Sequence, residues 1–370
     1  MARVIKDFEK TKRIRHKQRR PRSSFGEVMY RVFALTFAAA LAISYISVYV
    51  DPSDFWIPMY FGLFYIPLAL LNVIMLILGA AKARRAVLIP ILALLPTLAI
   101  SDRFVKIGND SEEVTGNKVK ILTYNLGRYS AAGGKSTPQQ SVSGIKTFIQ
   151  AESADIVCLQ EVSVRDSALL DACLPSYPYR ACHFFKGNRY FGNVTLSRYP
   201  IAGNEVIRFP RSTNLVLASD IKVGEGMVKV FNCHLESNSI SFTSLIKHLS
   251  KKATFQEEVV HVHGKLRDAA VKRSLQVKAV LESEEQSCCP TILCGDFNDM
   301  PLSYTYHELT ASKKDSFVEA GSGFSGTYSV LWPLLRIDYI LIPGECGVTD
   351  HTINRIPYSD HYPVSANIYF

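Results

Sequence analysis

Long uncharged apolar runs dominate the first third of the chain. Val32–Val50 and Phe55–Ala81 form runs of 19 and 27 residues without a charged side chain. A helix needs about 20 apolar residues to cross the hydrocarbon core of a bilayer, so both runs predict membrane-spanning helices. A third run, Ala86–Ser101, has 16 uncharged residues and contains Pro90 and Pro96. It predicts either a third span or a hydrophobic helix that lies on the membrane or packs on the other two.

Charges beside these runs predict the orientation of the chain. Residues 1–25 contain ten Lys or Arg and two acids, and Lys82, Arg84 and Arg85 lie between the second run and the third. Basic residues beside spans stay preferentially in the cytoplasm, so the N-terminus and this connection are expected inside. If the third run crosses, everything after Asp102 is extracytoplasmic, in a multi-pass membrane protein. We interpret the basic tail as an orientation signal in preference to a lipid or nucleic-acid contact.

The composition narrows the class of protein. Hydrophobic residues make up 48% of the chain, which excludes a disordered or coiled-coil protein. Residues 26–370 carry 32 basic and 31 acidic side chains, so the body of the protein is not a basic nucleic-acid binder. Three of the eight cysteines, Cys158, Cys233 and Cys294, lie in apolar strand-like runs and are expected to be buried free thiols.

The pattern changes after the apolar region. A polar, glycine-containing stretch at residues 102–117 predicts a linker. From Lys118 to Phe370, short runs rich in β-branched and aromatic residues predict strands, and Gly144–Ala151 and Phe255–Glu285 predict helices. This order predicts a mixed α/β domain in which packed sheets are covered by helices. We therefore expect a basic cytoplasmic tail (1–25), a transmembrane region of two to three helices (26–101), a linker (102–117) and an α/β domain (118–370).

Polar side chains close many of the predicted strands. A carboxylate at the end of a buried strand is costly unless it is paired, protonated or bound to a cation. Taken singly, such a residue is more often a turn or helix cap. Together, these strand-end groups predict one functional site, made of Asn125, Glu161, His234, Asp296, Asn298, Asp338, Asp360 and His361.

The chemistry of this set suits metal-assisted phosphoryl transfer. Carboxylate and amide oxygens are hard ligands that favour Mg²⁺ or Mn²⁺ over zinc. His234 and His361, the latter able to pair with Asp338, supply donors for phosphate oxygens and a proton for the leaving group. Asp296, with Asn298 two residues on, suits a general base held by a neighbouring amide. The predicted reaction is hydrolysis of a phosphate ester.

Eight motifs, in this order, resemble the endonuclease/exonuclease/phosphatase superfamily: TYNL, CLQEV, GNVTLSRYPI, NCHLES, CGDFND, GTY, RIDYIL and SDHYPV. The resemblance covers about residues 118–370. It implies a four-layered α/β sandwich, with two packed mixed β-sheets flanked by helices and the active site at one edge of the sheets. Three apolar segments before such a domain resemble a bacterial group of membrane-anchored members.

The resemblance also implies a divalent metal, Mg²⁺ or Mn²⁺, and its ligands. Glu161 matches the main metal ligand of the superfamily, and Asn125 and Asp360 match positions near the metal.

The same resemblance implies the catalytic roles. Asp296 matches the residue that orients or deprotonates the attacking water, and Asn298 matches a phosphate contact beside it. His361 paired with Asp338 matches the histidine that polarises the phosphate. His234 matches a second contact to the phosphate or the leaving group.

Other polar residues have less specific patterns. Arg273 and Gln276 lie in a helical pattern before the CGDFND strand, and we expect them to be structural. Asn193 could approach the phosphate or serve a strand turn. His261 and His263 alternate in an HVH sequence, and without a neighbouring third ligand we expect them to be solvated.

The sequence therefore predicts a membrane-anchored, divalent-metal-dependent hydrolase acting on a phosphate ester, in preference a phosphodiester. Its expected partners are the lipid bilayer and a substrate that is a phospholipid, a small molecule or a nucleic acid, with no obligate protein partner. A nuclease acting on DNA or RNA is an alternative, which the near-zero charge of the domain disfavours. A catalytically silent membrane scaffold is a second alternative, which the complete set of acidic, amide and histidine positions disfavours.

Overall fold

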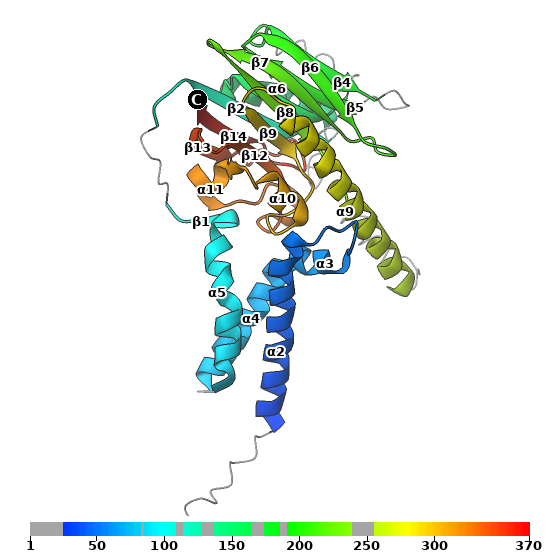
Figure 1. The fold of residues 1–370 in the computed structure, drawn as a ribbon, viewed down its shortest axis with the longest axis vertical. Helices are drawn as coiled ribbons and strands as arrows, with labels where there is room; N and C mark the ends of the chain where they lie inside the picture. Colours follow the sequence, from blue (N-terminus) through cyan, green and yellow to red (C-terminus); the bar gives the residue numbers. More distant parts are fainter. Residues whose placement is uncertain are drawn as a thin grey trace, which may run out of the picture.

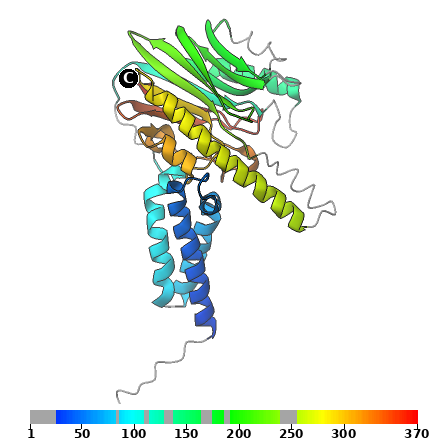
Figure 2. The same ribbon diagram turned by 45° about the vertical axis from the view of Figure 1, so that its right-hand side comes forward.

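Three long helices stand below a layered α/β domain (Figures 1 and 2). The computed structural model describes residues 25–82, 85–108, 114–127, 137–163, 174–185, 191–238 and 255–370. Almost all of the basic tail, as well as Arg84 and Cys173, lies outside these ranges. The helices of the apolar region are α2 (Phe25–Ile46), η1 (Ser47–Tyr49), α3 (Ile57–Leu63), α4 (Tyr65–Ala81), η2 (Arg85–Val87), α5 (Leu88–Ile100) and η3 (Ser101–Arg103).

The first and third apolar runs each form a continuous helix. Phe25–Tyr49 has 25 residues and Arg85–Arg103 has 19, and both are long and apolar enough to cross a membrane. Short 3₁₀ turns at both ends lengthen α5 beyond the 16 uncharged residues that the sequence offered. Pro96 lies inside α5 without ending it. With these turns, the helix formed by the third run reaches the length of a membrane span. Its 16 uncharged residues alone are shorter than that.

The second apolar run differs from the single helix that the sequence predicts. α3 and α4 meet at Phe64 with a bend of 67°. Pro67 accounts for the break, because it has no N–H to donate to the Leu63 carbonyl and its ring would clash with that carbonyl in a continuous helix. The run thus gives a 17-residue helix, α4, and a short helix, α3, set at an angle to its beginning. If α3 and α4 together form one bent span, the apolar region contains three candidate spans.

The long helices bond to one another through polar groups and leave apolar surface outside. The Tyr30 hydroxyl donates to the Met75 carbonyl at 2.9 Å, and the Asn72 amide donates to the Phe37 carbonyl at 3.0 Å. Pairing of this kind is what a low-dielectric surrounding requires. An outward apolar surface of this extent marks an interaction site. It includes Val32, Phe33, Leu35, Leu70, Ile74, Ile77, Leu78, Leu88, Leu92, Leu95 and Leu98.

In the part of the chain that the structure describes, the domain contains two six-stranded mixed sheets and a two-stranded ribbon. One sheet has the order β10 (Lys313–Asp315), β12 (Asp338–Pro343), β9 (Thr291–Asp296), β8 (Gly226–His234), β7 (Leu215–Val223), β6 (Ile201–Arg208). The other has the order β13 (Gly347–Ile353), β14 (Val364–Tyr369), β2 (Lys118–Asn125), β3 (Ile156–Ser163), β5 (Phe191–Ser197), β4 (Tyr179–Phe184). The ribbon pairs β1 (Val105–Lys106) with β11 (Gly323–Phe324).

The sheets pack face to face and helices cover their outer faces, which confirms the four-layered sandwich. Residues such as Ile121 and Val230 fill the core between the sheets. Leu122 packs toward α6 (Pro138–Glu152) on one outer face, and Val277 of α9 (Phe255–Glu285) packs on the other. Among the described residues, the remaining helical elements are α10 (Tyr304–Leu309), α11 (Ser316–Ala320) and η7 (Ser329–Leu331). The thiols Cys158, Cys233 and Cys294 are buried and free, as the sequence predicts.

The short helix α3 joins the apolar region to the domain. A side chain at Gly62 would collide with the Leu302 carbonyl, so the α3 backbone approaches the domain closely. The Tyr60 hydroxyl lies 2.5 Å from His263 Nδ1, and the rings of Trp56 and His263 lie 4.9 Å apart. The sequence prediction that His263 is solvated was therefore wrong, since this side chain packs on α3; His261 is exposed as predicted.

Candidate active site

Two β–α–β units direct polar residues to one edge of the sandwich. β2 and β3 are parallel and are connected through α6, and β8 and β9 are parallel and are connected through α9. Parallel neighbours end at the same edge of a sheet. Asn125 is the last residue of β2, His234 the last of β8 and Asp296 the last of β9. Since the sheets pack face to face, these three side chains converge.

Asp296 is a buried carboxylate held by two amides. Its Oδ2 accepts from Asn125 Nδ2 at 2.8 Å and from Asn298 Nδ2 at 3.0 Å. The Asn298 backbone amide donates to Oδ1 at 2.9 Å, and Asn298 adopts a left-handed φ of 54° to do so. Burial raises the pKa of Asp296, the charge of His361 lowers it, and the net value is about 7. This carboxylate is thus fixed in place and suited to accept a proton near neutral pH.

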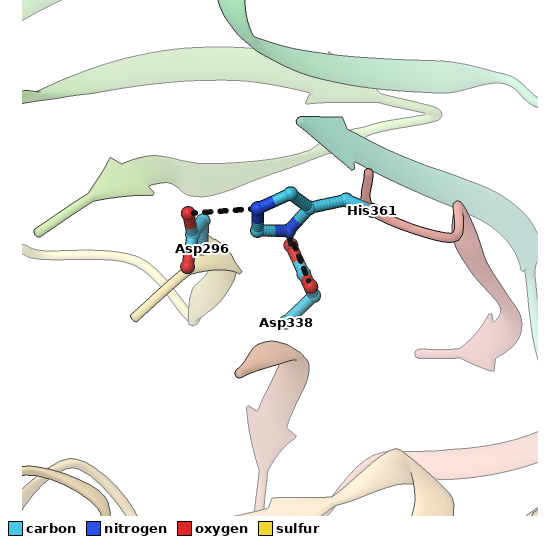
Figure 3. Close-up of side chains that lie close together, drawn as sticks. All are labelled: Asp296, Asp338 and His361. Carbon is cyan, nitrogen blue, oxygen red and sulfur yellow. Dashed lines mark hydrogen bonds and ion pairs between the residues drawn. The ribbon is translucent and has the colours of Figure 1, made fainter. Parts of the chain in front are cut away.

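His361 lies between two aspartates (Figure 3). Its Nδ1 lies 2.9 Å from Asp338 Oδ2, and its Nε2 lies 3.9 Å from Asp296 Oδ2. Thr327 holds Asp338 in turn, because its hydroxyl accepts the Asp338 backbone N–H at 3.1 Å. The Tyr328 ring packs edge-on against the imidazole at 5.3 Å. Burial lowers the pKa of His361, but the charges of Asp338 and Asp296 outweigh burial and raise it to about 10.

A β-bulge directs Glu161 toward the strand end. Leu159 and Val162 both pack in the core on the α6 side, although residues two apart share a face in a regular strand. Glu161 is the extra residue, with a φ of 53°, where the pairing of β3 with β5 shifts. Its Oε1 lies 3.7 Å from His234 Nε2. The bulge therefore brings to the site a carboxylate that a regular strand would point toward α6.

Ser359 connects Asp360 to the end of β2. Its hydroxyl donates to the Asn125 carbonyl at 2.8 Å and lies 3.4 Å from Asp360 Oδ1. Gly127 donates its N–H to Asn125 Oδ1 at 2.9 Å, and a side chain at Gly127 would collide with the Asp360 carboxylate. Burial and the nearby charge of Glu161 raise the pKa of Asp360. Asn125 and Asp360 thus occupy one end of the site together.

The donor set fits a hard divalent cation. Burial and the negative charges of Asp360, Asp296 and Glu161 raise the pKa of the Tyr328 hydroxyl to about 12, so three carboxylates act on one point. Like charges gathered in this way favour a bound cation. Oxygen donors are the ligands that Mg²⁺ and Mn²⁺ prefer. Glu161 and Asp360, with the Asn125 amide oxygen, are the residues that we expect to hold the ion.

Asp296, Asp338 and His361 form a second group with metal-binding potential, since one ligand atom of each lies within 4.8 Å of the others. Nδ1 of His361 is already engaged by Asp338, and the raised pKa keeps the imidazole protonated. A cationic imidazole has no lone pair for a metal. We therefore interpret His361 and Asp338 as a phosphate-binding pair and retain the oxygen donors as the metal ligands.

The site residues border a cavity of about 270 Å³. Asp296, Asn298, Glu161, Asp360 and His361 line this space. A neighbouring hollow of about 430 Å³ is lined by Glu161, His234 and Asn193, among others. All eight residues that the sequence predicts thus lie in contact with these spaces or with one another, and their catalytic roles remain predictions.

Outside this set, the structure accounts for three further residues of the sequence prediction. Arg273 donates to Asp299 Oδ2 at 3.1 Å and to the Glu236 carbonyl at 2.9 Å, and Gln276 accepts the Glu236 N–H at 2.7 Å. Both side chains brace the loops after β8 and β9, as expected of structural residues. Asn193 is buried and bonds the Asn232 carbonyl at 2.9 Å, which favours its structural reading.

Three residues that contact the site side chains received no role from the sequence. Thr327 and Tyr328 lie in the GTY motif and Ser359 in the SDHYPV motif, so the motifs contained a signal without assigning a role. Leu63 carried no signal, because it is one leucine within a long apolar run, yet it lines the same cavity as Asp296.

The sequence pattern of the Endonuclease/Exonuclease/phosphatase family matches residues 122–361. The chain belongs to this family. The matched range is most of the chain and contains every predicted site residue. Residues 27–104, the apolar region, match a domain of unknown function (DUF8431).

The chain is similar to several known proteins. Uncharacterized protein YbhP of Escherichia coli K12 is 25% identical over 271 residues, covering 68% of this chain and 96% of YbhP. An endonuclease/exonuclease/phosphatase from Beutenbergia cavernae has a similar structure, with a TM-score of 0.51, 17% identity and coverage of 69% of this chain and 72% of that one. TDP2 from C. elegans has a TM-score of 0.49 at 19% identity, covering 70% of this chain and 77% of that one.

Proposed function

We propose that the protein is a membrane-anchored, divalent-metal-dependent phosphoesterase that hydrolyses a phosphate ester, and we favour a phosphodiester over a phosphomonoester. The main support for this proposal is the arrangement of polar groups around the carboxylate of Asp296. This buried carboxylate is fixed by two amide side chains, and the Nε2 atoms of His234 and His361 each lie 3.9 Å from its Oδ2. Hydrolysis of a phosphate ester requires a general base, hydrogen-bond donors to the phosphate and hard metal ligands. All of these groups lie together at one edge of the sandwich.

In the proposed reaction, Asp296 accepts a proton from a water molecule. The water oxygen forms a bond to phosphorus as the ester P–O bond breaks, and the departing alkoxide takes a proton from solvent. His361 in its cationic form donates through Nε2 to a nonbridging phosphate oxygen, and His234 makes a second contact there. Glu161, Asn125 and Asp360 would hold Mg²⁺ or Mn²⁺, whose positive charge would stabilise the negative charge that develops on the phosphate.

The arrangement of the long helices supports membrane anchoring and an extracytoplasmic domain. The beginning of α2, the end of α4 and the beginning of α5 lie at one end of the bundle, and the domain lies at the other (Figure 1). If all three helices cross, the tail and Lys82–Arg85 share one side of the membrane and the domain occupies the other. Basic residues beside spans stay in the cytoplasm, so the domain is proposed to lie outside.

Metal removal tests the proposed function. Purified full-length protein in detergent is incubated with nucleic acids, phospholipids, inositol phosphates and generic phosphate esters, with Mg²⁺ and with a chelator. We expect turnover with Mg²⁺, its loss in the chelator and its recovery when Mg²⁺ or Mn²⁺ is restored. Full turnover in the chelator overturns the metal-dependent reaction. No turnover of any ester in the panel overturns the enzyme and favours the silent scaffold.

A further inference from the structure

The active-site cavity has both polar and apolar lining residues. Its polar lining, which we call the floor, is made of Glu161, Ser237, Asn238, Asp296, Asn298, Tyr328, Asp360 and His361. Five apolar residues make up the rest of the lining, which we call the walls. These apolar residues are Leu63 of α3, Leu266 of α9, Leu331 and Leu335 of the loop after β11, and Ile337. Five apolar side chains offer a phosphate group no hydrogen bonds. The lining therefore indicates that the substrate carries an apolar group attached to the phosphate.

One of these walls comes from the membrane side of the molecule. Leu63 is the last residue of α3, and α4 begins two residues later. The break at Pro67 and the close contact of Gly62 with Leu302 place the end of α3 against the domain. α4 carries part of the apolar outer surface, so Leu63 connects the cavity lining to a helix of the proposed membrane bundle.

A second part of the apolar lining comes from a loop of the domain. The loop of residues 328–337 lines the cavity with Leu331 and Leu335, and it exposes the side chains of Val330, Trp332 and Leu334. This loop lies beside the β1–β11 ribbon, because Trp332 contacts Phe324 of β11 at 5.8 Å between ring centres.

The β1–β11 ribbon ties this loop to the end of α5. Phe324 pairs with Val105 in the ribbon, only two residues after η3 ends at Arg103. Phe324, Val105 and Ile107 are all exposed, and Ile107 is 95% exposed. Arg355 stacks on Trp332 at 4.2 Å. Exposed aromatic and aliphatic side chains with an arginine are typical of surfaces at the membrane interface.

We propose that the substrate is a membrane lipid that carries a phosphate ester, which enters between α3 and the loop of residues 328–337. The phosphate lies on the polar floor and the acyl part lies between Leu63 and the loop, continuous with the bilayer. This inference rests on the proposed function. It favours a lipid over a nucleic acid, because residues 26–370 have almost no net positive charge for a polyanion and the walls beside the floor are apolar.

Comparison of lipids with their deacylated counterparts tests this inference. Full-length protein is reconstituted into vesicles of phosphatidylglycerol or phosphatidylethanolamine with Mg²⁺, and the products are compared with those from glycerophosphoglycerol, glycerophosphoethanolamine and a soluble aryl phosphodiester. We expect the diacyl lipid to be cleaved roughly 100-fold more efficiently than its deacylated form. Cleavage of the soluble diester without cleavage of either lipid overturns the lipid inference and leaves the proposed function intact. Cleavage of none of them overturns the proposed function.

A substitution in the wall tests the entry route. Leu63→Gln is compared with Leu98→Gln, a matched change at an exposed position of α5 outside the cavity. We expect Leu63→Gln to lower the ratio of lipid turnover to soluble diester turnover about tenfold, because an apolar contact in a binding site contributes discrimination of this order. Leu98→Gln is expected to keep the wild-type ratio. An unchanged ratio in a folded Leu63→Gln variant contradicts entry beside α3.

Discussion

The imidazole of His361 is oriented by Asp338, whose Oδ2 lies 2.9 Å from Nδ1. This contact leaves Nε2 pointing toward Asp296, at 3.9 Å from its carboxylate oxygen. Asp338 begins β12 directly opposite Asp296, the last residue of β9, in the antiparallel register. The pairing of two strands therefore sets the distance between the proposed base and the proposed phosphate donor.

Asp338→Asn tests this relationship. The amide is nearly isosteric, so we expect the fold to persist, but it removes the charge that favours the cationic form of His361. We expect kcat to fall roughly 100-fold with a smaller change in KM, since the donor acts on charge that develops in the transition state. Steady-state kinetics on a generic phosphate ester measures both constants. A wild-type kcat would mean that Asp338 does not act through His361.

A buried ion pair stabilises the loop that leads into β12. Arg336 bonds Asp315 at 2.5 and 2.7 Å. Burial raises the pKa of Asp315, but the charge and hydrogen bonds of Arg336 and the hydrogen bond from Tyr306 together outweigh burial and lower it. Asp315→Asn leaves Arg336 buried without its counter-charge and should lower the free energy of unfolding by about 3–5 kcal/mol. Denaturant titration in detergent measures this loss.

A substitution at an exposed residue provides the control for the Asp315→Asn prediction. Asp268 is exposed on α9 and pairs with its neighbour Arg267, so Asp268→Asn should change the free energy of unfolding by less than about 0.5 kcal/mol. Replacing both Asp315 and Arg336 by apolar residues should recover much of the loss. Equal stability of Asp315→Asn and Asp268→Asn would show that the buried pair contributes little.

His351 predicts a pH dependence of stability. It is buried beside Ser316, whose hydroxyl lies 2.8 Å from Nδ1, and burial and the charge of Arg336 lower its pKa from 6.5 to about 3. The folded state cannot take up the proton that the unfolded state binds below pH 6.5. The contribution of His351 to the free energy of unfolding is therefore complete above pH 6.5. It is lost as pH falls toward 3, and the loss is about 2 kcal/mol at pH 5.

Comparison of the wild type with His351→Gln isolates this group. We expect the wild type to lose about 2 kcal/mol more than the variant between pH 7.5 and pH 5, since the glutamine does not titrate. Unfolding midpoints in denaturant at the two pH values give the difference. Parallel losses in the two proteins would exclude His351 as the source.

Much of the site could be predicted from the sequence because strand ends carry a local signal. Asn125, His234 and Asp296 each follow a buried strand, and parallel strands bring their ends to one edge. The bend at Phe64 also has a local cause in Pro67, but the length of the apolar run concealed it. The position of Leu63 in the cavity could not be predicted, because it depends on how α3 packs against the distant Leu302.

The sidedness of the domain is a separate prediction. Three crossings place the N-terminus and the domain on opposite sides, and the 19 residues of Arg85–Arg103 are enough for the last crossing. Protease added to intact spheroplasts should therefore degrade the chain after Asp102. Protection in intact spheroplasts, with cleavage once the membrane is opened, would place the domain in the cytoplasm.

The central claim is that Asp296 is the base of a metal-dependent phosphoesterase. The most direct measurement compares hydrolysis of a generic phosphate ester with Mg²⁺ by the full-length wild type, Asp296→Asn and Asp220→Asn, the last a control on β7. The account predicts that Asp296→Asn keeps its unfolding temperature within a few degrees but loses activity roughly 100-fold or more, while Asp220→Asn keeps both. Wild-type activity in a folded Asp296→Asn variant would contradict it.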